Sequence, residues 1–134
     1  MSRFLIDTNH LAPMLRDLHG TRQRMREAIK SGQRFGVCVP ILCELETGLH
    51  HTKHRDANSR VLTDLLKQVR IWPIERTLVQ IYAATFHELR SQGRVRSQVD
   101  ILIAALCRER KLVLLTADQD FTALPDIRTE NWLV

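Results

Sequence analysis

The chain lacks the marks of several protein classes. No apolar run in its 134 residues is long enough to cross a membrane, so we expect no membrane partner. The opening MSRFLIDTNHL lacks the apolar stretch and the cleavage site of a secretory signal peptide. The three cysteines (Cys38, Cys43 and Cys107) include no C-x-x-C pair, which argues against a disulfide framework or a zinc site. We therefore expect a cytoplasmic protein with buried, reduced thiols.

Nucleotide-binding and repeat signatures are also missing. No G-x-x-x-x-G-K-[ST] sequence occurs, so the use of ATP is not indicated. There is no internal repeat, low-complexity tract or linker, and 44% of the residues are hydrophobic. This length and composition predict a single domain over residues 1–134 with a proper core.

The chain does have an excess of positive charge. Its 20 Lys and Arg residues against 15 Asp and Glu residues give a formal net charge of +5. A basic balance is compatible with a polyanionic partner, although solvated helix faces produce the same counts.

Short apolar runs alternate with longer amphipathic segments. The runs predict strands at 4–6, 35–39 and 112–116, a short strand or edge segment at 71–74, and a final strand within 127–133. Three- and four-residue spacings predict helices at 21–30, 40 to about 54, 61–69, 78–89 and 100–110. This alternation predicts an α/β fold with a parallel sheet covered on both faces.

Acidic residues fall where these elements begin or end. Asp7 ends the first strand in FLIDTN, and both Asp118 and Asp120 follow the strand in LLTADQDF. Glu44 lies in the first turns of the helix after the second strand, and Asp100 opens the helix DILIAAL. Each could simply cap a helix or turn, as Asp7 would before the next segment. In an open α/β sheet, however, the crevice beyond the carboxyl ends of the strands binds ligands.

Several carboxylates in one crevice repel one another unless a cation lies among them. Oxygen-rich clusters of this kind bind Mg²⁺ or Mn²⁺, which can activate water for hydrolysis of a phosphodiester. Without Asp7, Glu44, Asp100 and Asp118, 11 acidic side chains remain against 20 basic ones. That balance suits a nucleic acid as the substrate.

Taken in order, FLIDTN, ELETG, DILIAA and LLTADQDF resemble the PIN-domain nucleases, most closely the VapC toxins of type II toxin–antitoxin pairs. The similarity extends from residue 3 to the final NWL. The resemblance implies an α/β/α sandwich with a central parallel sheet and a Mg²⁺- or Mn²⁺-dependent ribonuclease. It further implies a cognate VapB-like antitoxin that blocks the site. We also expect a homodimer, from the resemblance and from apolar helices around Leu62 and Tyr82.

The resemblance assigns roles by position. Asp7, Glu44 and Asp100 match the three principal acids of the family, and Asp118 matches the fourth, with Asp120 as the alternative metal ligand. Thr8, Asn9 and Thr116 match small polar residues beside the site, and Gly48 matches a glycine after the acidic helix turn. The approach to Asp100, RVRSQV, departs from the more apolar, Gly- or Pro-containing approach of many relatives.

Other interpretations fit less well. A receiver domain would need an Asp after FGVCV and a Lys after LLT, and a haloacid-dehalogenase-type phosphatase would need an acid where Asn9 stands. A PIN-domain nuclease of housekeeping RNA processing, without an antitoxin, remains the alternative. His50 and His54, at i and i+4, are interpreted as a solvated face, and Trp72 and Trp132 as core or dimer packing. His10 and His87 gain no support as general bases.

Overall fold

The computed structural model describes residues 2–134, and within them the strands form one five-stranded parallel sheet of order β3-β2-β1-β4-β5. The strands are β1 (Arg3–Ile6), β2 (Arg34–Val37), β3 (Arg70–Ile71), β4 (Val113–Leu115) and β5 (Thr129–Glu130). The helices are α1 (Thr8–Leu15), α2 (Thr21–Lys30), α3 (Val39–Leu49), α4 (Arg55–Leu66), α5 (Leu78–Ser91) and α6 (Gln98–Arg110), with a 3₁₀ helix η1 (Gln119–Ala123). The predicted α/β class with a parallel sheet is confirmed.

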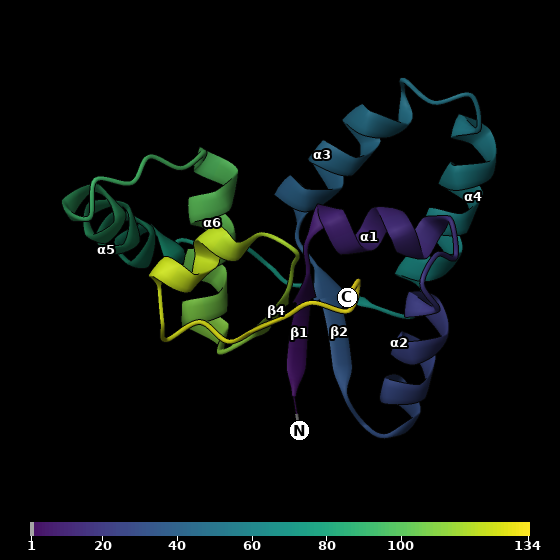
Figure 1. Ribbon diagram of the computed structural model, residues 1–134, viewed down its shortest axis with the longest axis horizontal. Coiled ribbons are helices and arrows are strands. Elements are labelled where there is room, and N and C mark those ends of the chain that lie inside the picture. The colour runs from purple at the N-terminus through teal and green to yellow at the C-terminus, as the bar shows by residue number, and fades with distance from the viewer. Residues whose placement is uncertain (1) are drawn as a thin grey trace.

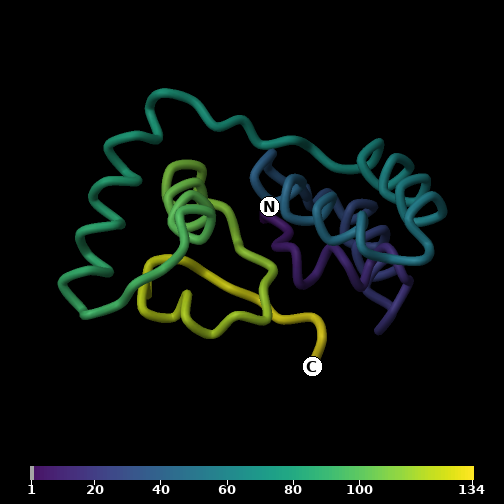
Figure 2. The backbone as a smooth tube through the Cα atoms, turned by 90° about the horizontal axis from the view of Figure 1, so that it is seen from above, coloured from purple at the N-terminus to yellow at the C-terminus, as the bar shows by residue number. Residues whose placement is uncertain are grey.

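Helices cover both faces of the sheet. Figures 1 and 2 show α1 to α4 on one side of the strands, and α5 and α6 on the other. The chain moves outward from β1 to β3, then returns to place β4 on the other side of β1. Because parallel crossovers are right-handed, this reversal puts the two groups of helices on opposite faces. The expected α/β/α sandwich is therefore present, and the strand order reverses between β1 and β4.

Aromatic packing anchors the end of the chain to the sheet. The Phe4 ring on β1 stacks on the Phe35 ring on β2 at 4.6 Å between centroids, and the Trp132 ring packs edge-on against both. The Trp72 indole N–H donates a 2.9 Å hydrogen bond to the backbone oxygen of Phe4. Both tryptophans are buried, as predicted for core packing.

The helix boundaries between residues 8 and 66 differ from the predictions. Helix α1, which carries Pro13, was not among the predicted helices. Helix α3 ends at Leu49, short of residue 54, because the N–H and the hydroxyl of Thr52 both donate to the Leu49 carbonyl and close the last turn. A separate helix, α4, then begins at Arg55, six residues before the predicted start at 61.

Other differences are smaller. Of the segment predicted at 71–74 only Ile71 pairs as a strand, together with Arg70, and of the final strand predicted within 127–133 only residues 129–130 do. Strand β2 ends at Val37 because Val39 already begins α3. Asp100 does not open α6: Ser97 is the N-cap, and its hydroxyl oxygen accepts the Asp100 N–H at 3.1 Å. Cys38 and Cys107 are buried as expected, whereas Cys43 is exposed on α3. Within residues 2–134, no helix combines the length and hydropathy required to span a bilayer.

Candidate active site

Asp7 lies where β1 gives way to α1, beside the end of β4. Its N–H donates to the Leu115 carbonyl at 3.0 Å, which extends the β1–β4 ladder by one bond. The carboxylate caps α1 through Oδ1, which accepts the Thr8 N–H at 2.8 Å, as the capping interpretation expects. Its Oδ2 accepts the Thr116 hydroxyl at 2.8 Å, and the residue is only 8% exposed. Asp7 thus lies at the reversal point of the sheet, where open α/β sheets bind ligands.

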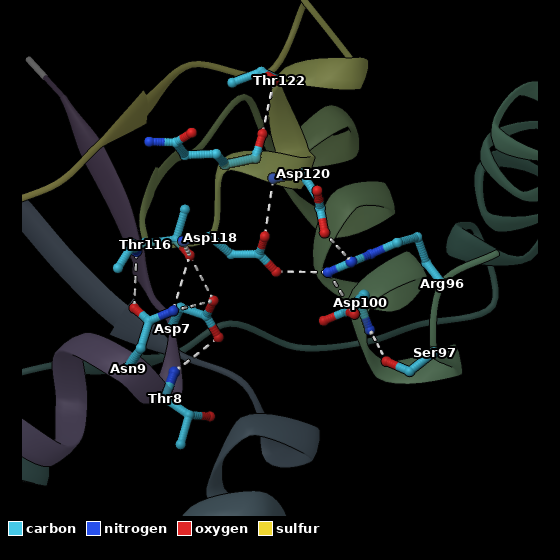
Figure 3. Close-up of polar contacts among 12 residues, drawn as sticks. Asp7, Thr8, Asn9, Arg96, Ser97, Asp100, Thr116, Asp118, Asp120 and Thr122 are labelled. Atoms are coloured by element: carbon cyan, nitrogen blue, oxygen red, sulfur yellow. Dashed lines mark hydrogen bonds and ion pairs between the residues drawn. The ribbon is translucent and has the colours of Figure 1, made fainter. Parts of the chain in front are cut away.

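Asn9 and Thr116 lock the Asp7 carboxylate in place. The Asn9 amide nitrogen donates to Thr116 Oγ1 at 3.1 Å and to Asp7 Oδ2 at 3.3 Å. Asn9 Oδ1 accepts the backbone N–H of Ala117 at 3.1 Å, which fixes the orientation of the amide. The network ties the loop after β4 to the start of α1 (Figure 3).

His10 extends this network to the end of the chain. Its Nε2 accepts the Trp132 backbone N–H at 2.9 Å, so Nδ1 carries the proton and donates to Asn9 Oδ1 at 2.8 Å. The ring is fully buried, and burial, followed by the nearby Arg24 charge, lowers the pKa of His10 to about 4. The sequence gives no sign of this role, because Trp132 is 122 residues away.

Glu44 approaches Asp7 from α3. Its Oε1 accepts the Thr8 hydroxyl at 3.3 Å, so Thr8 bonds both acids, one through its backbone and one through its side chain. Burial raises the pKa of Glu44, and the negative charges of Asp7 and Asp100 raise it further, against the Thr8 hydrogen bond.

Arg96 lies among the remaining acids and was not singled out from the sequence. One of its terminal nitrogens contacts Asp100 Oδ2 at 2.9 Å and Asp118 Oδ2 at 2.6 Å, and the other pairs with Asp120. Figure 3 shows the guanidinium pointing into the space between these three side chains. The only sign of it in the sequence is the unusual RVRSQV approach to Asp100.

Asp118, not Asp120, caps the turn after β4. Asp118 Oδ1 accepts the Asp120 N–H at 2.9 Å and begins η1, while the Asp118 N–H donates to Thr116 Oγ1 at 3.0 Å. The cap falls on Asp118 because an Asp side chain reaches the backbone N–H two residues ahead of it. Asp118 is thereby tied through Thr116 to Asp7, and Asp120 lies farther out with its side chain 54% exposed.

The acids near Asp7 and the acids around Arg96 differ in how their charges are balanced. Burial raises the pKa of Asp7 above its usual range; hydrogen bonds from Thr116 and Thr8 oppose the shift, and the charges of Asp100 and Asp118 add to it. Burial lowers the pKa of Arg96, but its acidic neighbours outweigh burial and raise it. Within residues 2–134, every ion pair made by these acids goes to Arg96, and none reaches Asp7 or Glu44.

The predicted ligands therefore lie at one end of the sheet but do not already form a cage. Among residues 2–134, no three Asp, Glu, His or Cys side chains converge on a point where one ion could be held. Their donor chemistry nonetheless fits a hard divalent cation, because every candidate oxygen belongs to a carboxylate. The charge of Asp100 raises the pKa values of both Asp7 and Glu44, which indicates an excess of negative charge that such a cation would neutralise.

Comparison with known proteins agrees with this geometry. The sequence model described as "PIN domain" matches residues 4–127. The chain belongs to the PIN domain family. The matched region includes all five acids of the site, from Asp7 to Asp120.

Relatives of this PIN domain match it over nearly their whole length. "Ribonuclease VapC2" of Haemophilus influenzae is 26% identical over 137 residues, covering 99% of this chain and 100% of the relative. "Ribonuclease VapC2" of Rickettsia felis is 22% identical, covering 96% and 97%. The fold resembles that in the VapBC2 structure from R. felis bound to a promoter DNA fragment, with a TM-score of 0.86 at 21% identity, over 97% and 98% of the two chains. VapBC-1 from nontypeable H. influenzae gives a TM-score of 0.80 at 19% identity, over 98% and 99%.

Proposed function

We propose that this PIN-domain protein is a cytoplasmic VapC-type endoribonuclease, the toxin of a toxin–antitoxin pair. It hydrolyses RNA phosphodiester bonds with Mg²⁺ or Mn²⁺ held by Asp7, Glu44, Asp100 and Asp118. The observation that best supports the proposal is that Thr116 bonds both Asp7, after β1, and Asp118, after β4, at the reversal point of the sheet in a PIN domain, while Thr8 links Asp7 to Glu44. The names of the relatives agree with it.

The chain's own residues would prepare this chemistry. Thr8, Asn9 and Thr116 hold Asp7 in one orientation by hydrogen bonds of 2.8 to 3.3 Å, so the carboxylate needs little reorganisation. When bound, a divalent cation would offset the charge of the carboxylates and supply an activated water. The basic balance of the remaining surface would hold the RNA backbone.

We propose a VapB-like antitoxin as the partner. Among solved structures with similar folds, one from Mycobacterium tuberculosis is described as a member of the VapBC family of toxin-antitoxin systems, and one from Klebsiella pneumoniae as a toxin-antitoxin complex. In this chain, Asp7 and Glu44 make no ion pair with any residue from 2 to 134. A basic side chain of the antitoxin would therefore find two carboxylates here that no arginine of this chain contacts.

Asp7→Asn tests the catalytic assignment. The amide keeps the shape of the side chain but removes one ligand charge, so we expect RNA cleavage to fall at least ~100-fold and growth arrest to be lost. Asp17→Asn, an exposed substitution between α1 and α2, is the matched control and should leave both unchanged.

Three outcomes separate the parts of the proposal. An Asp7→Asn protein that still cleaves RNA at the wild-type rate would refute the site. Cleavage by the wild type that survives removal of divalent ions by EDTA would refute the metal requirement. Metal-dependent cleavage without growth arrest on expression, and with no inhibitory partner, would favour a nuclease of housekeeping RNA processing.

A further inference from the structure

Arg96 forms ion pairs with three acids of the cluster at once. It lies just before the Ser97 cap of α6, and its planar guanidinium contacts carboxylates from three points of the chain. Its side chain is only 22% exposed and lies against the Phe121 ring, 5.9 Å from the centroid. A guanidinium presents several donors in a fixed fork, so it can bond several carboxylates at once, as a lysine could not.

The oxygens that Arg96 contacts are the ones a metal ion would need. One nitrogen of Arg96 lies 2.9 Å from Asp100 Oδ2 and 2.6 Å from Asp118 Oδ2. Asp100 and Asp118 are two of the four proposed ligands, whereas Asp7 and Glu44 are not in contact with Arg96. Two cations cannot share the same carboxylate oxygens at these distances without strong repulsion.

We infer that Arg96 is an internal counterion that competes with the divalent cation for Asp100 and Asp118 and has to leave them before the cation binds. The inference rests on the proposed function. Arg96 stabilises the protein without metal, because it offsets the repulsion among the acids, and it weakens the affinity for the metal for the same reason. The nuclease is thereby restrained until the free cation concentration is high enough to displace the arginine.

The chain before α6 has room for this exchange. Residues 94–97 form neither helix nor strand, and Gly93 (φ 71°) separates them from α5. Val95, next to Arg96, is 80% exposed, so its side chain does not anchor this segment in the core. A rotation of the long Arg96 side chain into solvent would release both carboxylates while Ser97 still caps α6.

Metal binding by matched variants tests the competition. We expect Arg96→Gln to bind Mn²⁺ on the order of tenfold more tightly than the wild type by calorimetry, since the competing charge is gone. Arg94 lies two residues before Arg96 and its side chain is exposed, so Arg94→Gln is the matched control. It removes the same charge and should change the Mn²⁺ affinity less than about twofold. Arg96→Lys keeps the charge without the fork and should lie between wild type and Arg96→Gln.

A measurement on the unmodified protein guards against a variant that fails to fold. In ¹⁵N spectra, the Arg96 side-chain N–H signals should be shifted and protected without metal, and should move to the position of exposed arginines as Mg²⁺ is added. The Arg94 signals should not move. Thermal melts should show that Mn²⁺ stabilises Arg96→Gln more than it stabilises Arg94→Gln.

Each contrary result has its own meaning. Equal Mn²⁺ affinity of Arg96→Gln and wild type, or Arg96 signals that stay protected at saturating Mg²⁺, would overturn the inference and leave the proposed function standing. RNA cleavage with no Mn²⁺ binding by any of the four proteins would overturn the metal dependence itself, and this inference with it.

Discussion

Asp7 serves the fold and the site with the same carboxylate. It caps α1 and accepts the Thr116 hydroxyl, yet burial raises its pKa, so the folded protein disfavours the charged form. Asp7→Asn removes that charge and keeps an oxygen that can accept the Thr8 N–H, although its amide nitrogen cannot accept from Thr116 and Asn9 as Oδ2 does. Relief of the desolvation and of the repulsion from Asp100 and Asp118 opposes that loss. We therefore expect the melting temperature of the metal-free variant to equal or exceed that of the wild type, while cleavage is lost. A fall of many degrees would show that the carboxylate is required by the fold.

His10 makes stability depend on pH. Its pKa is lowered from 6.5 to about 4 in the folded protein, so between these values the unfolded chain binds the extra proton. The contribution of neutral His10 to the free energy of unfolding is therefore fully present above pH 6.5. As the pH falls towards 4, the free energy of unfolding decreases by roughly 3 kcal/mol. Urea unfolding at intervals between pH 7 and 4.5 should show this decline.

His10→Gln isolates that contribution. The raised pKa values of Asp7 and Glu44 act in the opposite direction, since their contribution is present at low pH and is lost as the pH rises through the folded values. The variant keeps both acids, so the difference between the two pH profiles reports His10 alone. We expect His10→Gln to be less stable near pH 7 and to lose much less on acidification. Parallel profiles would contradict the assigned neutral state of His10.

Asp118 and Asp120 should differ in function. Asp118 is connected to Asp7 through Thr116 and caps η1, whereas Asp120 is more exposed and lies farther from Asp7 along this chain of bonds. We expect Asp118→Ala to reduce Mn²⁺-dependent cleavage strongly and to cost about 1 kcal/mol of stability through the lost cap. Asp120→Ala should reduce cleavage less.

Asp118→Asn separates the two effects, because an Asn side chain still caps a helix but carries no charge. It should recover the stability and not the cleavage. If Asp120→Ala loses Mn²⁺ affinity while Asp118→Ala keeps it, the fourth ligand is Asp120.

At the scale of the elements, the sequence predicts the middle of each helix or strand better than the residues at which it begins and ends. The central strands β1, β2 and β4 follow from apolar runs, because a strand buried on both faces needs little polar alternation. Helix α1 was missed because only eight residues, with Pro13 inside, carry its pattern. The break between α3 and α4 depends on hydrogen bonds from Thr52 to Leu49, which no periodicity encodes.

The same contrast applies to the site. Acids placed at strand ends could be predicted, because parallel strands bring their carboxyl ends to one edge. Arg96 and His10 could not, since each acts through partners that only the fold brings close: Asp118 is 22 residues from Arg96, and Trp132 is 122 residues from His10.

Two glycines place opposite demands on their elements. A Cβ on Gly36 of β2 would lie 2.3 Å from the Trp72 indole nitrogen, so the ring would have to move and lose its bond to Phe4. We expect Gly36→Ala to cost about 2–4 kcal/mol in urea unfolding. Gly48→Ala in α3 meets no atom within 4 Å and is the control. It should stabilise the protein by up to about 1 kcal/mol; equal effects of the two substitutions would contradict this packing.

At the scale of the whole molecule, the reversal of strand order creates the site. Because β1 leads into α1 on one face of the sheet and β4 leads towards the other face, the ends of these two neighbouring strands are where a ligand site is expected. Residues from both halves of the chain lie at these strand ends, and the acids there contrast with a net positive charge of the chain. That contrast suits a nuclease, which has to bind a polyanion broadly and to concentrate negative ligands at one point.

An apolar surface on α5 is the candidate dimer interface. Val79 is 62% exposed and Ile74 39%, and both border a pocket that Leu78, Tyr82 and Leu102 also line. Of the two apolar helices considered for the dimer, α4 has its Leu62 side chain buried in the core, which leaves α5 as the candidate. Exposed apolar residues that cluster in this way mark association surfaces more often than isolated ones do.

We therefore expect the protein to have about twice the monomer mass of 15.6 kDa in light scattering at micromolar concentration, and Val79→Lys to shift it to the monomer. A lysine at position 79 would bury an unpaired charge in an apolar interface. Because a symmetric dimer contains the same residue twice, the cost is paid on both subunits. Leu18→Lys changes an exposed apolar residue between α1 and α2, outside this surface, and should leave the mass unchanged. A wild-type protein that stays monomeric would refute the dimer, and a Val79→Lys dimer would show that the subunits meet elsewhere.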